Sequence, residues 1–313
     1  MEIKKTATRD AYGKALVELG EKYDNLIVMD ADLASATKTG VFKKAYPEKF
    51  FDCGIAEGNM MGIAAGLAAS GKLVFASSFA MFAAGRAFEQ IRNSIAYPHL
   101  NVKIGASHAG ISVGEDGASH QCCEDIALMR SIPGMVIINP ADEFEARQAV
   151  LAAAEYYGPV YLRFGRLAVE NVFDESYKFE WGKAVEVKEG NDVTIISTGL
   201  MTLEAVKAAK ILEDEGVSAR VLNIHTIKPL DVEAVLKAAS ETGDVTAEEH
   251  NIIGGLGSAV CEAICTECPV PVLRVGVEDT FGKSGPAKEL LEAYRLNADH
   301  IVEKVRVALS MKK

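Results

Sequence analysis

The sequence predicts an α/β protein with two domains, each a mainly parallel sheet covered by helices. Short runs of β-branched and apolar residues alternate with longer helical patterns along the chain, which is typical of parallel strands joined by helical crossovers. The chain has 313 residues, whereas one domain usually has about 100–200. The alternation breaks near residues 170–190, which predicts a boundary there.

The first domain is predicted over residues 1–170. Its expected strands are NLIVMD (25–30), KLVFASS (72–78), NVKIGAS (101–107), MVIINP (135–140) and PVYLRF (159–164). Its expected helices lie between those strands, in RDAYGKALVELGEKY, EGNMMGIAAGLAAS, GRAFEQIRNSIAY and EFEARQAVLAAAEYY.

Residues 171–190 are predicted as a linker, because the stretch from residue 167 onward is charged and aromatic without helical periodicity. A second domain is expected over residues 191–313. Its expected elements are DVTIISTG, a helix at 202–215, SARVLNIHTIKPL, a helix at 231–240, DVTAEEH, the GGLGSAVCEAI helix, VPVLRVGV and a closing helix at 298–313.

Composition and charge exclude several functions. A formal net charge of −11 argues against nucleic-acid binding, and neither a P-loop nor a dinucleotide fingerprint is present. The opening MEIKKTATRDAYGKAL has no apolar core typical of a signal peptide or membrane span. Six cysteines without an export signal predict a reducing, cytoplasmic setting. Cys261, Cys265 and Cys268 are interpreted as core thiols rather than as a metal site.

The stretch CGIAEGNMMGIAAGLAASG (53–71) places one carboxylate, Glu57, at the start of an expected helix. Glycines at every fourth position make a smooth helix face, although Gly58 and Gly62 each cost a helix about 1 kcal/mol relative to alanine. A carboxylate at the edge of such a close-packed face is poorly solvated, which suits a proton-transfer group. A simple favourable charge at a helix N-terminus is the alternative.

Aromatic residues follow in ASSFAMFAAGRAFEQIRNS (76–94). Phe79, Phe82 and Phe88 are either core residues or a shelf for a flat heteroaromatic ring. Residue spacing alone leaves both interpretations open.

The densest polar segment is SHAGISVGEDGASHQCCED (107–125). His108 and His120 bracket Glu115 and Asp116 on an expected loop after a strand, where α/β sheets bind ligands. The spacing fits no common zinc pattern. Basic groups that could hold a phosphate are found elsewhere in the acidic chain, at Arg9, Arg163 and Arg166.

In combination, three of these motifs resemble the transketolases. They are D-x-G-I-A-E (52–57), the F-x-x-F segment, and H-x7-D-x3-H within the histidine-rich loop, and VEDTFGKSG (277–285) is also similar. The resemblance covers nearly the whole chain, but only the C-terminal portion of the family's proteins. It implies a pyrimidine-binding domain followed by the transketolase C-terminal domain.

The resemblance also implies a cofactor and a partner. The family binds thiamine diphosphate between two domains, with the diphosphate and a divalent metal, Mg²⁺ or Ca²⁺, on a domain that carries G-D-G. That motif is absent here. The chain therefore resembles one subunit of a split transketolase, with no metal ligands of its own. We expect an N-terminal partner subunit to carry the diphosphate and metal site, in a heterotetramer with two copies of each subunit.

By matching position, the resemblance gives roles at the cofactor. Glu57 is similar to the glutamate that hydrogen-bonds the aminopyrimidine ring nitrogen. Phe79 and Phe82 match aromatic residues packed on that ring, while a third family aromatic falls at Gly85. Ile55 and Asp32 are similar to residues beside the cofactor, so both are expected in its site.

The resemblance gives substrate roles as well. His120 would contact the C1 oxygen of the donor, and Asp116 the C2 hydroxyl of the acceptor. The sugar phosphate would be held by His108, by Arg9 and by one of two arginines in YLRFGR. Arg166 is favoured over Arg163 by spacing, and Ser35 is adjacent to the place of the family's phosphate-binding serine.

The activity implied is transfer of a two-carbon glycolaldehyde unit from a ketose phosphate to an aldose phosphate, as in the pentose phosphate pathway. The A-E-G sequence around Glu57 is closer to 1-deoxy-D-xylulose-5-phosphate synthase, which is one alternative. The beta subunit of a 2-oxoacid dehydrogenase is another, although it lacks the GEDG-x-x-HQ loop. A non-catalytic structural subunit is opposed by the intact Glu57, Asp116, His108 and His120.

Overall fold

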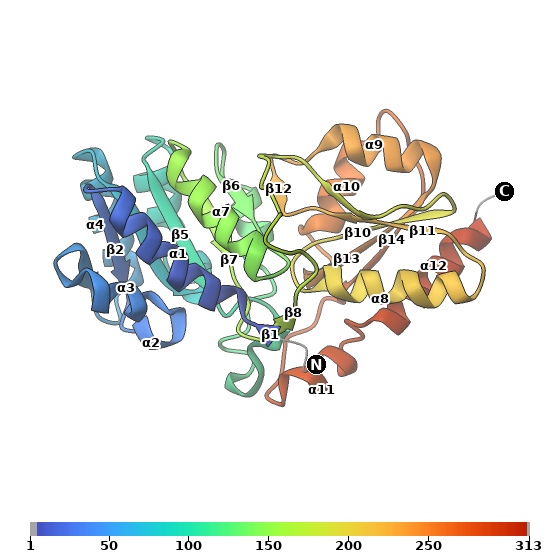
Figure 1. Cartoon of the computed structure of the whole chain (residues 1–313), viewed down its shortest axis with the longest axis horizontal. Helices are drawn as coiled ribbons and strands as arrows, with labels where there is room; N and C mark the ends of the chain where they lie inside the picture. The colour runs from blue at the N-terminus through green and yellow to red at the C-terminus, as the bar shows by residue number, and fades with distance from the viewer. Residues whose placement is uncertain (1–4, 312–313) are drawn as a thin grey trace.

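The structure, a computed structural model, describes residues 5–311, and its first domain is built on a seven-stranded sheet (Figure 1). All neighbouring strands in this sheet are parallel except the edge pair formed by β12 and β6. In spatial order the strands are β12 (Thr226–Lys228), β6 (Val136–Ile138), β7 (Val160–Arg163), β5 (Val102–Ser107), β4 (Leu73–Phe79), β2 (Leu26–Asp30) and β3 (Phe50–Asp52).

Helices cover both faces of this sheet. One face packs against α1 (Thr8–Lys22), α3 (Thr39–Ala45) and α7 (Glu143–Glu155). The other packs against α4 (Glu57–Ala69), α5 (Phe88–Gln90), α6 (Asp125–Arg130) and two wide helical turns at Met81–Arg86 and Ile91–Ala96. The short α2 (Ala34–Thr37) follows β2, and 3-10 turns occupy Pro47–Lys49 and Ile111–Asp116.

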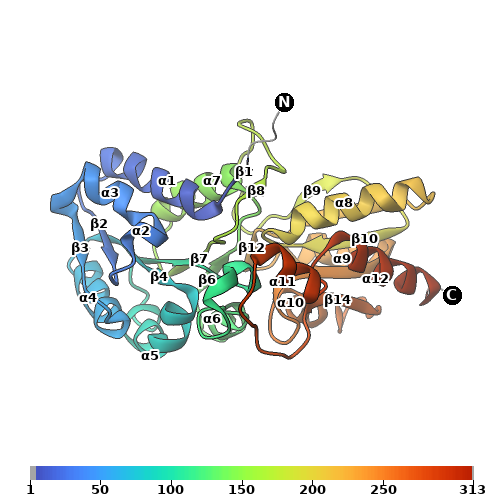
Figure 2. The ribbon, with the colours of Figure 1, turned by 90° about the horizontal axis from the view of Figure 1, so that it is seen from below.

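The second domain has a five-stranded sheet beside the first domain, shown in yellow to red in Figure 2. In spatial order its strands are β14 (Val272–Val277), β13 (Gly243–Asn251), β10 (Val193–Ser197), β11 (Ala219–Asn223) and β9 (Val185–Lys188), and only β9 is antiparallel to its neighbour. Its helices are α8 (Met201–Asp214), α9 (Val232–Glu241), α10 (Leu256–Ile264), α11 (Ala287–Ala293) and α12 (Ala298–Met311). The predicted fold class is confirmed.

The chain crosses between the two domains more often than the sequence pattern indicates. The run SARVLNIHTIKPL, expected as one element of the second domain, is divided: β11 joins the second sheet, whereas β12 pairs with β6 of the first. Ile224 and Ile227 are buried there in a core shared by both domains. The predicted linker likewise contributes β9 to the second sheet, and β8 (Val169–Glu170) pairs with β1 (Lys5–Thr6).

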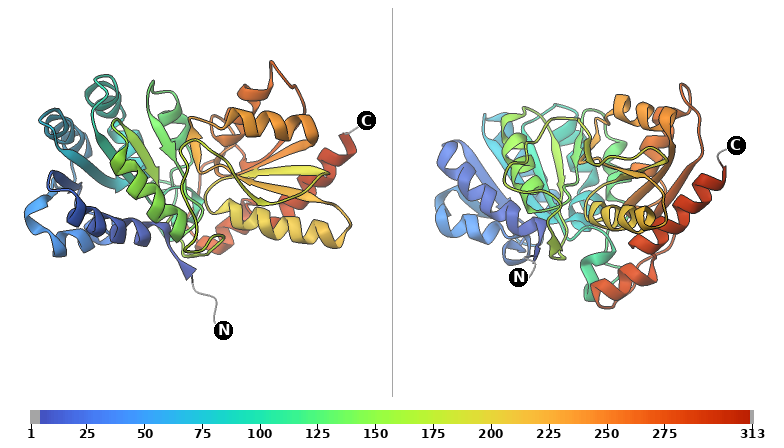
Figure 3. Two further views of the ribbon diagram at one scale, coloured as in Figure 1. Left: turned by 45° about the horizontal axis from the view of Figure 1, so that its top comes forward. Right: turned by 45° about the vertical axis from the view of Figure 1, so that its right-hand side comes forward.

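A single hydrophobic cluster therefore runs from one domain into the other. It contains Met60 and Ile104 of the first domain together with Leu222, Leu256 and Val260 of the second. Figure 3 shows the two sets of helices and strands against each other from two sides. Among the described residues, no helix is long and apolar enough to span a membrane. The last two residues of the expected closing helix, 312–313, lie outside the described residues.

Candidate functional site

Glu57 is the first residue of α4, next to the end of β3 in the first sheet. Its side chain is only 1% exposed, and its Oε2 accepts a hydrogen bond from Nη1 of Arg86 at 2.9 Å. Met60 and Met61, which follow on the same helix, are fully buried and anchor it against the sheet. The carboxylate is therefore held in place at a helix start, with a charged partner that offsets its burial.

Two phenylalanines are linked to this carboxylate through Arg86. Phe79 is the last residue of β4, and Phe82 is in the helical turn that follows. Their rings are nearly parallel, with an interplanar angle of 17° and centroids 5.9 Å apart. The Arg86 guanidinium stacks on Phe82 at 4.6 Å from the ring centroid. We call Glu57, Phe79, Phe82 and Arg86 the Glu57 cluster.

The two histidines of the polar segment reach the same aromatic pair. The ring of His108 stacks on Phe79, with centroids 3.8 Å apart, and the ring of His120 meets Phe82 edge-on at 5.2 Å. Residues 79 and 108 are at or just beyond the ends of neighbouring parallel strands β4 and β5. The carboxyl ends of the strands thus bring together residues that are far apart in the sequence.

His108 is a neutral imidazole with a defined tautomer. Burial, with Arg9 and Arg166 nearby, lowers its pKa to about 3. Arg9 can only donate, so its Nη1, 3.1 Å from Nε2 of His108, requires that nitrogen to be unprotonated. The other nitrogen, Nδ1, therefore donates to Oγ of Ser107 at 2.9 Å. Arg9 also donates to the carbonyl of Ala36, which ties α1 to α2 in the loop region after β2.

That loop carries Asp32 and Ser35, both of which are exposed. The loop is organised by Asp30. Its carboxylate accepts hydrogen bonds from the backbone N–H of Leu33 and from the hydroxyls of Thr37 and Thr39. Burial raises the pKa of Asp30 to about 6. Asp30 was not predicted as a site residue, because its role depends on contacts that strand and helix patterns do not specify.

Residues 108–121, which we call the histidine loop, carry the remaining predicted substrate groups. The loop is closed at its base by a hydrogen bond from the N–H of Gly110 to the carbonyl of Cys122. Asp116 is exposed near its tip, and His120 is half-buried. Arg166 is beside the loop and donates to the Glu115 carboxylate at 3.0 Å and to the carbonyl of Val113.

Arg163 lies in a different environment from Arg166. It is 3% exposed, and its guanidinium donates to both oxygens of Asp125, at 2.8 and 3.2 Å. It also donates to the carbonyl of Glu249 in the second domain. With these partners Arg163 fixes the domain junction, and its guanidinium is engaged with protein groups. Arg166, in contrast, is partly exposed beside the histidine loop.

Two residues of the predicted cofactor site differ in exposure. Ile55, just before α4, is 77% exposed, while Glu57 two positions later is buried. Arg86 is an addition that sequence reasoning missed, although its position four residues after Phe82, which is one helical turn, was a usable signal. Gly62 and Gly66 leave an open helix face, because a Cβ built at either position meets nothing within 4 Å.

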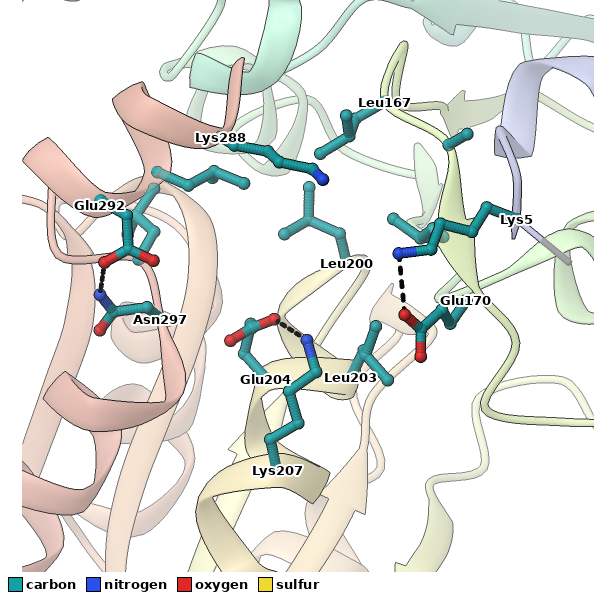
Figure 4. A pocket seen from close by; sticks show the side chains of 14 residues that line it. Lys5, Leu167, Glu170, Leu200, Leu203, Glu204, Lys207, Lys288, Glu292 and Asn297 are labelled. Carbon is teal, nitrogen blue, oxygen red and sulfur yellow. Dashed lines mark hydrogen bonds and ion pairs between the residues drawn. The ribbon is translucent and has the colours of Figure 1, made fainter. Parts of the chain in front are cut away.

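A cavity of about 310 Å³ lies between the domains, away from the residues just described (Figure 4). Its walls come from β8, α8 and α11, with leucines between the charged groups. Lys5 pairs with Glu170 and Lys207 with Glu204, while Lys288 extends toward Leu167 and Leu200 (Figure 4). Lysines and glutamates are balanced here, so the cavity offers no net charge to a ligand.

Comparison with known proteins shows the family to which the chain belongs. Residues 4–171 match the model described as transketolase, pyrimidine binding domain, and residues 182–301 match transketolase, C-terminal domain. The chain is thus a two-domain protein whose first domain is built to take the pyrimidine of thiamine diphosphate. It belongs to the transketolase family, and it corresponds to the C-terminal section of a split transketolase.

Individual relatives agree with this placement. A putative transketolase C-terminal section of Methanocaldococcus jannaschii is 52% identical over 95% of this chain and 94% of its own length. A 6-deoxy-6-sulfo-D-fructose transketolase subunit of a Clostridium species is 45% identical over 94% and 92%. A solved structure described as a split gene transketolase, inactive beta4 tetramer, is 53% identical, covers 99% of this chain and 100% of its own, and has a TM-score of 0.91.

The residues present fit one end of thiamine diphosphate. A buried carboxylate, joined through Arg86 to two nearly parallel aromatic rings, is suited to a flat heterocycle with a ring nitrogen. For the other end, the described residues 5–311 contain no group of three or more His, Cys, Asp or Glu side chains arranged to hold a metal ion.

Proposed function

We propose that this chain supplies the pyrimidine-binding and substrate-binding half of a transketolase that moves a two-carbon glycolaldehyde unit between sugar phosphates. The observation that carries the proposal is the meeting of the Glu57 cluster with His108 and His120 of the histidine loop. A proton-transfer carboxylate, a ring-stacking surface and polar groups for a sugar thus adjoin one another.

At the cofactor, Glu57 has the central role. Arg86 holds its Oε2, which leaves Oε1 to hydrogen-bond the ring nitrogen and to share a proton with it. Phe79 and Phe82 pack against the ring and exclude water from that hydrogen bond. Asp32, which follows β2, and Ile55, which precedes α4, would border the cofactor in this proposal. When bound, thiamine diphosphate supplies the electron sink that two-carbon transfer requires.

At the substrate, the histidine loop contacts the sugar oxygens and the arginines bind the phosphate. His120 donates to or accepts from the C1 oxygen of the donor, and Asp116 accepts from the C2 hydroxyl of the acceptor. Arg9, Arg166 and the Nε2 face of His108 bind the phosphate, with Ser35 as a further donor. The low pKa of His108, about 3, means that the positive charge comes from the arginines alone.

The second half of the site comes from an N-terminal partner subunit. That subunit would hold the diphosphate and a divalent metal, Mg²⁺ or Ca²⁺, since this chain offers the pyrimidine end. A relative of 53% identity is described as an inactive tetramer of beta chains, which supports a requirement for the partner. Two copies of each subunit would complete paired sites.

The terminal group of the sugar could be a phosphate or a sulfonate. Phosphate fits a pentose phosphate pathway enzyme, whereas a relative of 45% identity is named for 6-deoxy-6-sulfo-D-fructose. Both groups are tetrahedral anions that a pair of arginines can bind. We favour phosphate, because two guanidinium groups flanking a neutral histidine suit its higher charge.

The test is to co-purify the partner and to assay the reconstituted complex with a ketose phosphate donor and an aldose phosphate acceptor. We expect two-carbon transfer that depends on thiamine diphosphate and a divalent metal. A sulfonated ketose and a lipoyl acceptor serve as comparison substrates. Transfer to the lipoyl group in place of the aldose would overturn the proposal in favour of a 2-oxoacid dehydrogenase.

A further inference from the structure

The histidine loop is fastened to the second domain by a side chain that is not among the predicted site residues. Glu249, on β13, extends its carboxylate across the domain junction, and its Oε1 accepts the backbone N–H of Ser112 at 2.5 Å. Gly110 leaves room for this carboxylate: a Cβ there would come within 2.4 Å of the Glu249 carboxyl group, and its φ is +80°. The start of the loop is thus shaped around Glu249.

The other end of the loop makes a matching contact. Gln121 donates through Nε2 to the carbonyl of Ile111 at 3.1 Å and to the carbonyl of Lys283 at 3.0 Å. One amide thereby joins both ends of the loop to the segment before α11. Ser284 packs against the middle of the loop, where a Cβ on Gly117 would lie 2.4 Å from its Oγ.

The end of β13 is itself fixed to the first domain. The buried Arg163 donates to the backbone carbonyl of Glu249 at 2.9 Å, and the N–H of Asn251 donates to the carbonyl of Cys123 at 2.8 Å. The backbone that carries the Glu249 side chain is therefore hydrogen-bonded to the first domain at two points. Burial raises the pKa of Glu249 to about 7, and in its ionised form the carboxylate makes a stronger hydrogen bond to the Ser112 N–H than a neutral acceptor does.

We propose that Glu249 is a positioning residue: from the second domain it sets the place of the histidine loop, and through it of His120 and Asp116. The catalytic consequence rests on the proposed function, in which those two side chains contact substrate. The second domain then contributes to substrate recognition without touching the substrate. Because small misplacements of reacting groups can cost about 100-fold in rate, one buried acceptor can have a large effect on turnover.

The neighbouring residue on β13 is a matched control. Glu248 is as buried as Glu249, but its carboxylate accepts the N–H groups of Leu256 and Gly257 within its own domain. Removing either carboxylate leaves buried N–H groups unpaired. Of these two glutamates, it is Glu249 whose carboxylate accepts a hydrogen bond from the histidine loop.

The first experiment measures backbone hydrogen exchange in the chain and in its complex with the partner. We expect Glu249→Ala to speed exchange at Ser112 and across residues 110–121 at least tenfold, while Glu248→Ala speeds exchange near α10 instead. If Glu249→Ala fails to fold, Glu249→Asp, which withdraws the carboxylate by one methylene, gives the same comparison. Unchanged exchange in the loop, or equal effects of the 248 and 249 variants there, would overturn the proposal.

The second experiment uses the reconstituted enzyme. We expect Glu249→Ala to lower kcat/KM for the sugar substrates about 10- to 100-fold, with thiamine diphosphate affinity within about twofold of wild type. Glu249→Gln, whose amide oxygen still accepts from Ser112, should recover most of that loss. If Glu249→Gln is as impaired as Glu249→Ala, the positioning role is wrong. An inactive wild-type complex would count against the proposed function. The hydrogen-exchange experiment does not depend on enzyme activity, so it tests the role of Glu249 separately.

Discussion

The Glu57 cluster and the histidine loop adjoin each other, yet they are completed in different ways. The loop is covered and fastened by the chain's own second domain, through Glu249 and Gln121. The cluster borders an open helix face at Gly62 and Gly66 and a largely exposed Ile55. The difference agrees with the proposed function, in which this chain itself positions the histidine loop, whereas the cofactor-binding half needs a surface from a partner subunit.

The largest effect is expected at the Glu57 cluster. Glu57→Ala removes the proposed proton-transfer group, so kcat of the reconstituted enzyme should fall about 10²- to 10⁴-fold, as measured with the ketose and aldose phosphates. Assembly with the partner should persist, which size-exclusion chromatography checks. Near-normal turnover by this variant would remove Glu57 from the mechanism.

The open helix face gives the next largest effect. Gly62→Leu places a side chain where the chain itself has empty space, so the isolated variant should fold and should gain helix stability of about 1 kcal/mol. Its affinity for the partner should drop more than tenfold in a titration, with Gly62→Ala showing a smaller loss. Equal partner affinity in all three proteins would mean that this face is not the interface.

A moderate effect is expected beside the histidine loop. Arg166→Ala should raise KM for sugar phosphates about tenfold or more while changing kcat little, because loss of a phosphate contact weakens ground-state and transition-state binding alike. The same variant tested with a non-phosphorylated ketose should show little change. A fall in kcat with KM unchanged would instead place Arg166 in the chemical step.

The smallest effect concerns the junction between the domains. His225 is fully buried, and burial lowers its pKa to about 4, below the unfolded value of about 6.5. Its stabilising contribution is thus present above pH 6.5 and is lost as the pH falls toward 4, because the unfolded chain binds the extra proton. Relative to His225→Asn, wild type should lose about 1–3 kcal/mol of unfolding free energy between pH 6.5 and 4 in denaturant titrations. A constant difference would show that His225 does not titrate as described.

Local patterns in the sequence were sufficient for the fold class, and they singled out candidate site residues whose roles stay predictions. Alternating strands and helices identified both sheets, and the glycine-striped segment indicated Glu57 because its lone carboxylate conflicts with an apolar helix. Contacts across long sequence distances were not accessible in this way. The return of β12 to the first sheet, the Arg86–Glu57 pair and the Glu249–Ser112 hydrogen bond depend on how two domains pack. Spacing favours Arg166 over Arg163 as the phosphate-binding group, and the structure adds that Arg163 is buried in an ion pair with Asp125 whereas Arg166 is partly exposed.

The most direct test compares the chain alone with the chain plus its partner in one assay of two-carbon transfer, with thiamine diphosphate and Mg²⁺ present in both. We expect no measurable turnover and weak cofactor binding for the chain alone, and full turnover after the partner is added. Substantial turnover by the chain alone would contradict the claim that its cofactor site is only half a site.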